Sequence, residues 1–398
     1  MNIKEAFLVA SKYIPKSSQH AVLTYARVES GVMMATDLSA FVEIFIGESD
    51  NFNVSIPLIE RFLKKSSDVK VSAKNDDAIL TAGGAKYTFP MIDDHNFPEF
   101  PVCKGDRVNV SEQELAIAFS RVKKAISKND WKRILTGVNL SVADGKAYLT
   151  ATDGHHIAQT SMAWDKNQTF NITIPPKLFE GLSKKTIKNQ PPRMIEFWQD
   201  GFFACIKADN VTVKQRLLEG SFPAIGRLDS RAAAVLDLNF RYGLLDNLAI
   251  AKAYGSKTID IEIVEDELKL SIEMMDSMRS TFDIPTQSPS WLAYSAHVLS
   301  ELTPLISYMR VSRDGNLTAN LSFEYVSGAI DYRLPIHASC SQKVTVEIKA
   351  FENIISSLSK DSDILLNLNS GVSGLLEGVV SVGSLGDRGN TIWALMPK

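Results

Sequence analysis

The strongest constraint on the fold of this chain is a unit of strand, helix and hairpin that recurs along it. In its clearest form a short strand runs into a helix, and two strands joined by a tight turn follow. This form covers residues 53–89, 170–206 and 343–381, and related units begin near residues 1, 107, 232 and 292. One helix per unit argues against a propeller blade. Helices segregated from hairpins instead predict an α+β fold built from layers.

Length and charge limit what such a fold can be. The chain has 398 residues, with 43 Lys and Arg against 46 Asp and Glu. It is therefore not a bulk polycation, although a local basic patch would still bind nucleic acid. No apolar run reaches the roughly 18–20 residues of a membrane span, and the first residues lack the apolar core of a signal peptide. We expect a cytoplasmic protein with no membrane partner.

The cysteines support the same compartment. Cys103, Cys205 and Cys340 lie about a hundred residues apart, and their number is odd. This spacing favours reduced, buried thiols over a disulfide framework.

Two breaks in the repeating pattern divide the chain. His95–Gly105 is polar and rich in Pro, and Gly220–Asp229 closes the second pair of units. We therefore expect three domains, at residues 1–105, 106–228 and 229–398. The third is longer than the others, and Ser288-Pro289-Ser290 is a candidate mark of an inserted piece. Its helices are expected at 237–254, 296–310 and 347–360.

No group of residues predicts catalysis, a metal site or a bound cofactor. Among six histidines only His155 and His156 are adjacent, and neighbours on a strand point to opposite faces, which suits a metal poorly. Gly83-Gly84 fits a hairpin turn, because the spacing of a phosphate-binding loop is missing. The nucleophile elbow Gly-x-Ser-x-Gly is also absent. The sequence therefore predicts a protein that is not an enzyme.

Basic residues gather on the predicted helices. Segments 1–16, 57–65, 111–136 and 175–193 hold 17 Lys and Arg against 6 Asp and Glu, whereas the rest of the chain holds 26 against 40. Each segment alone is typical of a solvated helix face. Together, on units placed side by side, they predict a basic surface that contacts DNA phosphates without reading sequence. The candidate DNA-binding residues are Lys4, Lys12, Lys16, Arg61, Lys64, Lys65, Arg121, Lys123, Lys124, Lys128, Lys132, Arg133, Lys177, Lys184, Lys185 and Lys188.

Four short stretches carry a family resemblance. They are Asn96–Phe100, Ala151–Ala158 with the order Ala-Thr-Asp-Gly-His-His-Ile-Ala, Glu219–Pro223, and Ala394–Pro397. Together they resemble the bacterial DNA polymerase III beta subunits, the replicative sliding clamps. The resemblance is clear over residues 1–228 and at the C-terminus, and vague over 230–340.

The resemblance implies a clamp fold of three similar domains, with helices on the inner face and antiparallel sheets outside. It implies a homodimeric ring that encloses double-stranded DNA and tethers the replicative DNA polymerase. A separate clamp loader ATPase would place the ring on DNA, so the clamp itself needs no cofactor. Processivity then comes from topological linkage, and weak phosphate contacts leave the ring free to slide.

The family also has a hydrophobic pocket that receives short peptides from its partners. By position, the matching residues here are Leu135, Thr152, Gly154, His155, His156, Ile157, Pro223, Arg227, Leu228, Ala394, Leu395, Met396 and Pro397. An apolar floor with a few polar rim groups suits Leu or Phe anchors. Without the family resemblance, several of these residues would read as plain core.

The chain departs from the family pattern in three places. His156 stands where the family usually has Arg, Ile157 where it usually has Leu, and the sequence ends at Lys398, soon after Met-Pro. These changes affect the expected peptide preference. With the long third block, they leave one alternative: a clamp-like interaction protein that binds replication partners without closing on DNA.

Overall fold

The structure is a computed structural model of the chain. It describes residues 1–15, 18–65, 69–82, 84–92, 97–165, 167–182, 192–225, 234–236, 241–253, 257–264, 267–272, 277–284, 308–311, 317–324, 330–335, 337–338, 342–358, 364–370, 379–384 and 391–395.

The N-terminal part of the chain alternates helices with antiparallel strands. Its elements are α1 (Ile3–Ala10), η1 (Ala21–Thr24), β1 (Tyr25–Glu29), β2 (Val32–Thr36), β3 (Ala40–Phe45), β4 (Phe52–Ser55), α2 (Ile56–Lys65), β5 (Lys70–Lys74), β6 (Asp77–Ala82) and β7 (Ala85–Pro90). The Asn2 side chain begins α1, because it accepts hydrogen bonds from the N–H groups of Lys4 and Glu5 at 2.9 and 3.3 Å. Such a cap satisfies donors that have no partner inside the helix.

The middle part repeats this order. Its elements are β8 (Val108–Ser111), α3 (Glu112–Val122), η3 (Lys123–Ala125), η4 (Asp130–Thr136), β9 (Val138–Ala143), β10 (Lys146–Thr152), β11 (His156–Ala163), β12 (Phe170–Ile174), α4 (Lys177–Glu180), β13 (Met194–Gln199), β14 (Phe203–Ala208) and β15 (Val211–Arg216). The Ser111 hydroxyl caps α3 by accepting from Glu114 N–H at 3.2 Å. The expected helical segment 111–136 is interrupted after Val122, where two short 3-10 helices replace the α-helix.

The C-terminal part repeats it once more with an addition. Its elements are β16 (Ala234–Leu236), α5 (Arg241–Ala253), β17 (Thr258–Val264), β18 (Glu267–Ile272), β19 (Ser277–Ile284), β20 (Tyr308–Val311), β21 (Leu317–Glu324), β22 (Ile330–Pro335), β23 (His337–Ala338), β24 (Gln342–Glu347), α7 (Ile348–Ser357), β25 (Ile364–Ser370), β26 (Val379–Ser384) and β27 (Thr391–Leu395).

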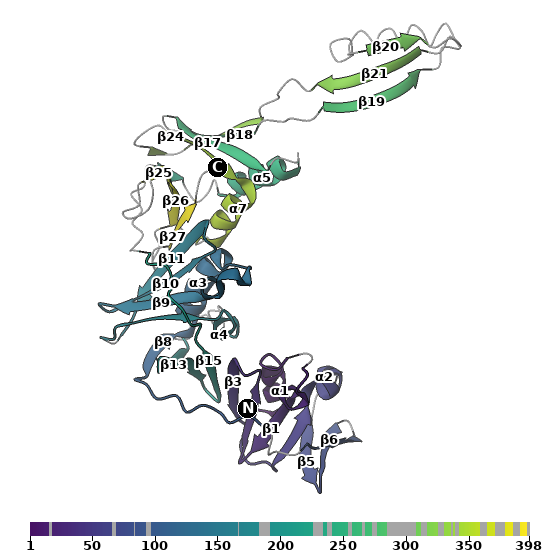
Figure 1. Cartoon of the computed structure of the whole chain (residues 1–398), viewed down its shortest axis with the longest axis vertical. Coiled ribbons are helices and arrows are strands. Elements are labelled where there is room, and N and C mark those ends of the chain that lie inside the picture. Colours follow the sequence, from purple (N-terminus) through teal and green to yellow (C-terminus); the bar gives the residue numbers. More distant parts are fainter. Residues whose placement is uncertain are drawn as a thin grey trace.

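The addition lies between two paired strands. β18 and β22 are neighbours in one sheet, while β19, β21 and β20 form a separate three-stranded sheet between them in the chain. Figure 1 shows this sheet projecting away from the rest of the molecule. The prediction of a helix at 296–310 is wrong for residues 308–310, which belong to β20. Residues 296–307 lie outside the described part of the chain.

Two large sheets run across the expected domain boundaries. The first has the order β4-β1-β2-β3-β15-β14-β13-β8, and the second β12-β9-β10-β11-β27-β26-β25-β16-β23. The antiparallel pairs β3·β15 and β11·β27 are the joints, and each joins the edges of two half-sheets. We call these joints the first and second junctions. Pairing of this kind also protects strand edges that would otherwise be exposed.

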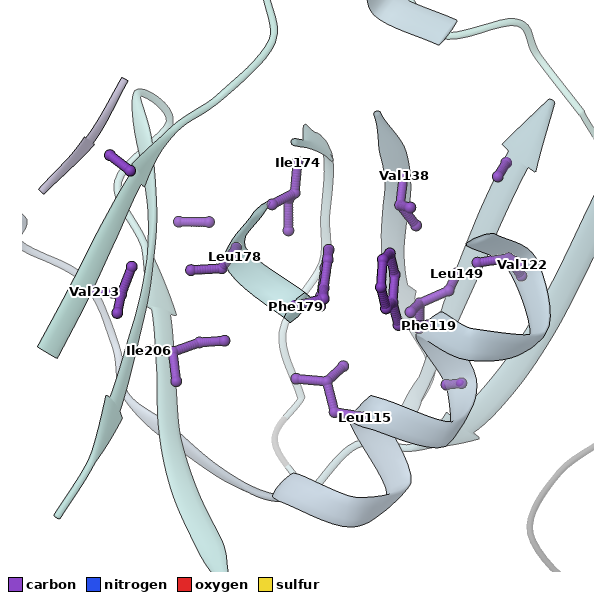
Figure 2. Packing of buried hydrophobic residues seen from close by; sticks show 14 of the residues in the cluster. Leu115, Phe119, Val122, Val138, Leu149, Ile174, Leu178, Phe179, Ile206 and Val213 are labelled. Carbon is purple, nitrogen blue, oxygen red and sulfur yellow. The ribbon is translucent and has the colours of Figure 1, made fainter. Parts of the chain in front are cut away.

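The helices follow one another along one side of the chain, and the large sheets lie on the other (Figure 1). In the middle part, Leu115, Phe119 and Val122 of α3 pack between β9–β10 and α4 (Figure 2). The Phe119 and Phe179 rings stack with centroids 4.9 Å apart. This spacing along α3 places one apolar stripe against the core.

Among the described residues, no helix is both long and apolar enough to cross a membrane. Cys103 and Cys205 are free thiols; Cys205 is buried, as expected, whereas Cys103 is only half-buried. Cys340 lies outside the described part of the chain.

Candidate partner-binding site

The Ala-Thr-Asp-Gly-His-His stretch forms a tight turn between β10 and β11. The Thr152 hydroxyl donates to the His156 carbonyl at 2.7 Å and accepts from Gly154 N–H at 3.1 Å. Asp153 Oδ1 accepts from the N–H groups of His155 and His156 at 2.9 and 2.8 Å. Gly154 adopts φ +95°, a conformation that costs glycine little. The residue types in this stretch therefore serve the turn directly.

A carboxylate–imidazole pair lies within the turn. Asp153 Oδ2 and His156 Nδ1 are 2.8 Å apart, and both side chains are about a quarter exposed. Burial raises the pKa of the Asp153 carboxyl, but the hydrogen bonds from the His156 side chain and from the two backbone N–H groups outweigh it. The net effect lowers this pKa to about 2. The pair holds the imidazole at the start of β11.

The C-terminal strand lies directly beside this turn. In the antiparallel pair β11·β27, His156 is opposite Leu395 and Ile157 opposite Ala394. The structure thus brings together two of the candidate stretches that are more than 230 residues apart in the chain. Leu135 at the end of η4 is buried, with 5% exposure, while His155 is exposed.

The remaining pocket candidates are placed less completely. Pro223 is exposed in the segment after β15, and its carbonyl accepts from Ile225 N–H at 2.8 Å. Gly220 in the same segment lies close to Ile134 of η4. Arg227, Leu228, Met396 and Pro397 lie outside the described residues.

The candidate DNA-binding residues divide into four groups. Those exposed on or after the helices are Lys12, Lys123, Lys124, Lys128, Lys132 and Arg133. Lys4 and Lys177 are half-buried, and Arg121 is buried, with 5% exposure. Four candidates lie outside the described part of the chain: Lys16, Lys184, Lys185 and Lys188. The structure likewise does not describe the side chains of three more, Arg61, Lys64 and Lys65. Arg121 therefore has almost no surface to offer a phosphate.

Three of these cations already have protein partners. Lys123 Nζ lies 3.2 Å from Glu180 Oε1 and 5.5 Å from the centre of the Phe119 ring. Lys124 Nζ donates to the Ser356 hydroxyl of α7, and burial lowers the pKa of this lysine, although nearby Glu352 raises it. Lys177 forms an ion pair with Asp37. These contacts tie neighbouring helices and domains together.

Comparison with known proteins relates the middle part of the chain to a described family. Residues 109–224 match the family described as the central domain of the DNA polymerase III beta subunit. The beta sliding clamp of Staphylococcus aureus is 24% identical over 269 residues, covering 65% of this chain and 71% of that protein. The chain is similar to the bacterial beta clamps.

Solved structures extend the likeness to the whole clamp fold. The DNA polymerase III beta subunit of Thermotoga maritima has a TM-score of 0.73 at 17% identity, covering 99% of this chain and 96% of that one. The sliding clamp of Bacillus subtilis has a TM-score of 0.72 at 16% identity, covering 100% and 96%. The α+β clamp fold predicted from the sequence is confirmed.

One feature of the clamp was missed at the level of sequence. The triplet Ala-Thr-Asp at 151–153 also occurs at 35–37, at the end of β2. The signal was the recurrence of a three-residue motif at equivalent places in two units.

Among the described residues, no cluster of His, Cys, Asp and Glu is arranged to hold a metal ion.

Proposed function

We propose that the chain is a DNA sliding clamp: two copies close into a ring around duplex DNA and tether a DNA polymerase. The observation that carries this proposal is the agreement of fold with beta clamps over nearly the whole chain. Sequence similarity to curated beta sliding clamps supports it independently. The role is mechanical, so we propose neither catalysis nor a cofactor. Placement on DNA would fall to a separate clamp loader ATPase.

The DNA-facing surface would be the side of the chain along which the helices lie (Figure 1). Lys12 follows α1, and Lys128 and Lys132 follow α3; all three are exposed and form no ion pair within the described part of the chain. Flexible, hydrated lysines of this kind attract phosphates without a fixed geometry. Contacts of that kind keep DNA in the ring and leave sliding free.

The second junction would receive the partner peptide. A turn stiffened by Thr152 and Asp153 presents His155 and His156 beside the end of β27. By the family resemblance, the buried Leu135 would contribute to the apolar floor of this site. Such a site combines an apolar floor with polar groups that orient a ligand. It remains a proposal that Pro223, Arg227, Leu228, Met396 and Pro397 complete the pocket.

The topological claim has a direct test. The chain is loaded on nicked circular DNA with a bacterial clamp loader and ATP, and retention is measured by gel filtration before and after the DNA is cut. We expect a dimer that stays on the circle and is released by linearisation. A strictly monomeric chain at micromolar concentration would favour the clamp-like interaction protein instead. Retention that is unaffected by cutting would exclude a ring.

The charged surface is tested in the same assay. Replacing Lys12, Lys128 and Lys132 together by Ala should shorten retention and reduce the salt dependence of binding by about three charges. The matched control replaces Lys70, Lys74 and Lys146, which are exposed on the strands β5 and β10. An equal loss in both variants would show that these helix lysines do not face DNA.

A further inference from the structure

The first junction contains a second copy of the turn found at the second junction. The Thr36 hydroxyl donates to the Ala40 carbonyl at 2.8 Å and accepts from Leu38 N–H at 2.9 Å. Asp37 Oδ1 accepts from the N–H groups of Ser39 and Ala40 at 2.9 and 2.7 Å. Each of these hydrogen bonds has its counterpart in the turn Thr152–His156.

The strand beside each turn is also equivalent. Ala40 is opposite Gln215 in β3·β15, as His156 is opposite Leu395 in β11·β27. The first junction thus has the same framework as the site proposed to bind partner peptides.

A cavity of about 590 Å³ opens at the first junction. Its walls come from the turn Asp37–Ser39, from η4, from the start of α4 and from residues 215–219. Its volume lies within the range of ligand-binding pockets. Leu38, at 48% exposure, is an apolar side chain displayed on its wall.

One buried polar atom at this cavity lacks a partner. Gln215 is 1% exposed, and its Nε2 donates to the carbonyls of Ser39 and Arg216 at 2.8 and 3.4 Å. These two carbonyls require the amide N–H groups on that side, so Oε1 is the atom left over. Oε1 is buried and accepts no hydrogen bond in the structure. The Gln215 side chain therefore joins the turn to the end of β15 through its amide N–H groups.

The charges around the cavity leave one cation over. Asp37 pairs with Lys177, and Arg216 pairs with Glu219 at 3.1 Å. Arg133 lines the cavity, is exposed, and forms no ion pair with any described residue. A carboxylate is its natural partner, since the guanidinium fork matches carboxylate geometry. The excess positive charge therefore favours an acidic ligand.

We propose that the first junction is a second docking site, for a short linear peptide that carries an acidic residue next to an apolar one. The apolar side chain would lie on Leu38 and the carboxylate on Arg133. This site is separate from the peptide pocket of the proposed function. The proposal rests on that function only through the equivalence of the two turns. Arg133 is thereby assigned to peptide binding and not to DNA.

The test is photo-crosslinking of the full chain to a synthetic peptide, acetyl-Gly-Asp-photoleucine-Leu-Gly-Ser amide, with the labelled residues mapped by mass spectrometry. We expect crosslinks within residues 37–39 or 215–219. R133E should lower their yield about threefold to fivefold. The control K146E makes the same charge change on β10, away from the cavity, and should leave the yield unchanged. Leu38→Gly, which suits φ +70° and removes the apolar wall, should lower it as well.

The outcomes separate the two sites. Crosslinks at 152–157 but not at 37–39 or 215–219 would overturn the second site and leave the proposed function intact. Crosslinks at the first junction that R133E and Leu38→Gly do not reduce would overturn it too. Competition by a short DNA duplex at the first junction alone would show a DNA contact and contradict the peptide. Absence of crosslinks at both junctions would contradict both peptide sites.

Discussion

The first and second junctions share one turn and differ in what completes it. At the first, Asp37 pairs with Lys177 of α4, so the ion pair crosses from one part of the chain to the next. At the second, Asp153 pairs with His156 inside the turn itself. The position after Asp is Leu38 at φ +70° in one turn and Gly154 at φ +95° in the other. The same hydrogen bonds thus support two kinds of turn. In the first junction the Asp pairs with a residue of another element, and in the second it pairs with a residue of the turn itself.

This difference indicates how a repeated unit acquires separate roles. The first turn uses its carboxylate to hold two domains together, and Lys177 lies 5.6 Å from the Tyr13 ring as well. The second turn forms its ion pair between two of its own residues, and its His155 is exposed. Sequence relatives within one chain can therefore share local structure without sharing function.

The largest expected effect tests whether the two turns are energetically equivalent. T36V and T152V each remove a buried hydroxyl that both donates and accepts. The N–H left behind loses this partner, and the carbonyl keeps only a 3.3 Å hydrogen bond from the N–H of Asp37 or Asp153. Each should lower the free energy of unfolding by about 1–3 kcal/mol. Urea unfolding measures the change. T24V, which removes a single exposed hydrogen bond, is the control, and a loss at only one of the two turns would break the equivalence.

The next effect concerns the residue after Asp in each turn. Gly154→Ala places a side chain at φ +95° and should destabilise the chain by about 1 kcal/mol. Leu38→Gly should instead be close to neutral, because relief at φ +70° offsets the added freedom of the unfolded chain. Thermal unfolding of the two variants distinguishes them. Equal destabilisation by both changes would show that backbone conformation does not separate the turns.

A smaller effect appears in acid. The pKa of Asp153 is about 2 in the folded chain and lies near 3.8 ordinarily. A lowered folded-state pKa stabilises above pH 4 and is lost as the pH falls toward 2. Asp153→Asn should therefore cost about 1 kcal/mol at neutral pH, after allowance for solvent screening, and should flatten the pH dependence between 4 and 2. Urea unfolding at both pH values measures this, and an unchanged slope would contradict the assignment.

The smallest effect is expected at the ion pair that crosses the first junction. Burial raises the pKa of Asp37, but hydrogen bonds from Lys177, the Ala40 backbone and Ser39 lower it overall. Lys177→Met keeps most of the packing against Tyr13 and should raise this pKa while destabilising the chain by about 0.5 kcal/mol. NMR titration of the Asp37 carboxyl reports the shift. If that pKa does not move, the lysine does not bridge the domains in solution.

Much of the fold could be read from local pattern. Alternating strands, the hairpin at Asp144-Gly145 and the start of α3 at Ser111 follow from residues close together in sequence. The break after Val122 could not be read this way, since apolar residues continue at helical spacing beyond it. The same holds for Arg121, whose burial depends on what packs over α3. Basic residues on a helix therefore do not by themselves define a DNA-facing surface.

The sequence by itself determined the repeated unit, the turn chemistry of Thr152 and Asp153, and the likeness to clamps, because each depends on neighbours a few residues apart. Only the tertiary structure decided which strand edges meet. The pairing of β11 with β27, and of β3 with β15, joins segments separated by more than 160 residues. Strand pairing over such distances depends on which edges the rest of the fold leaves open, and local sequence does not encode that.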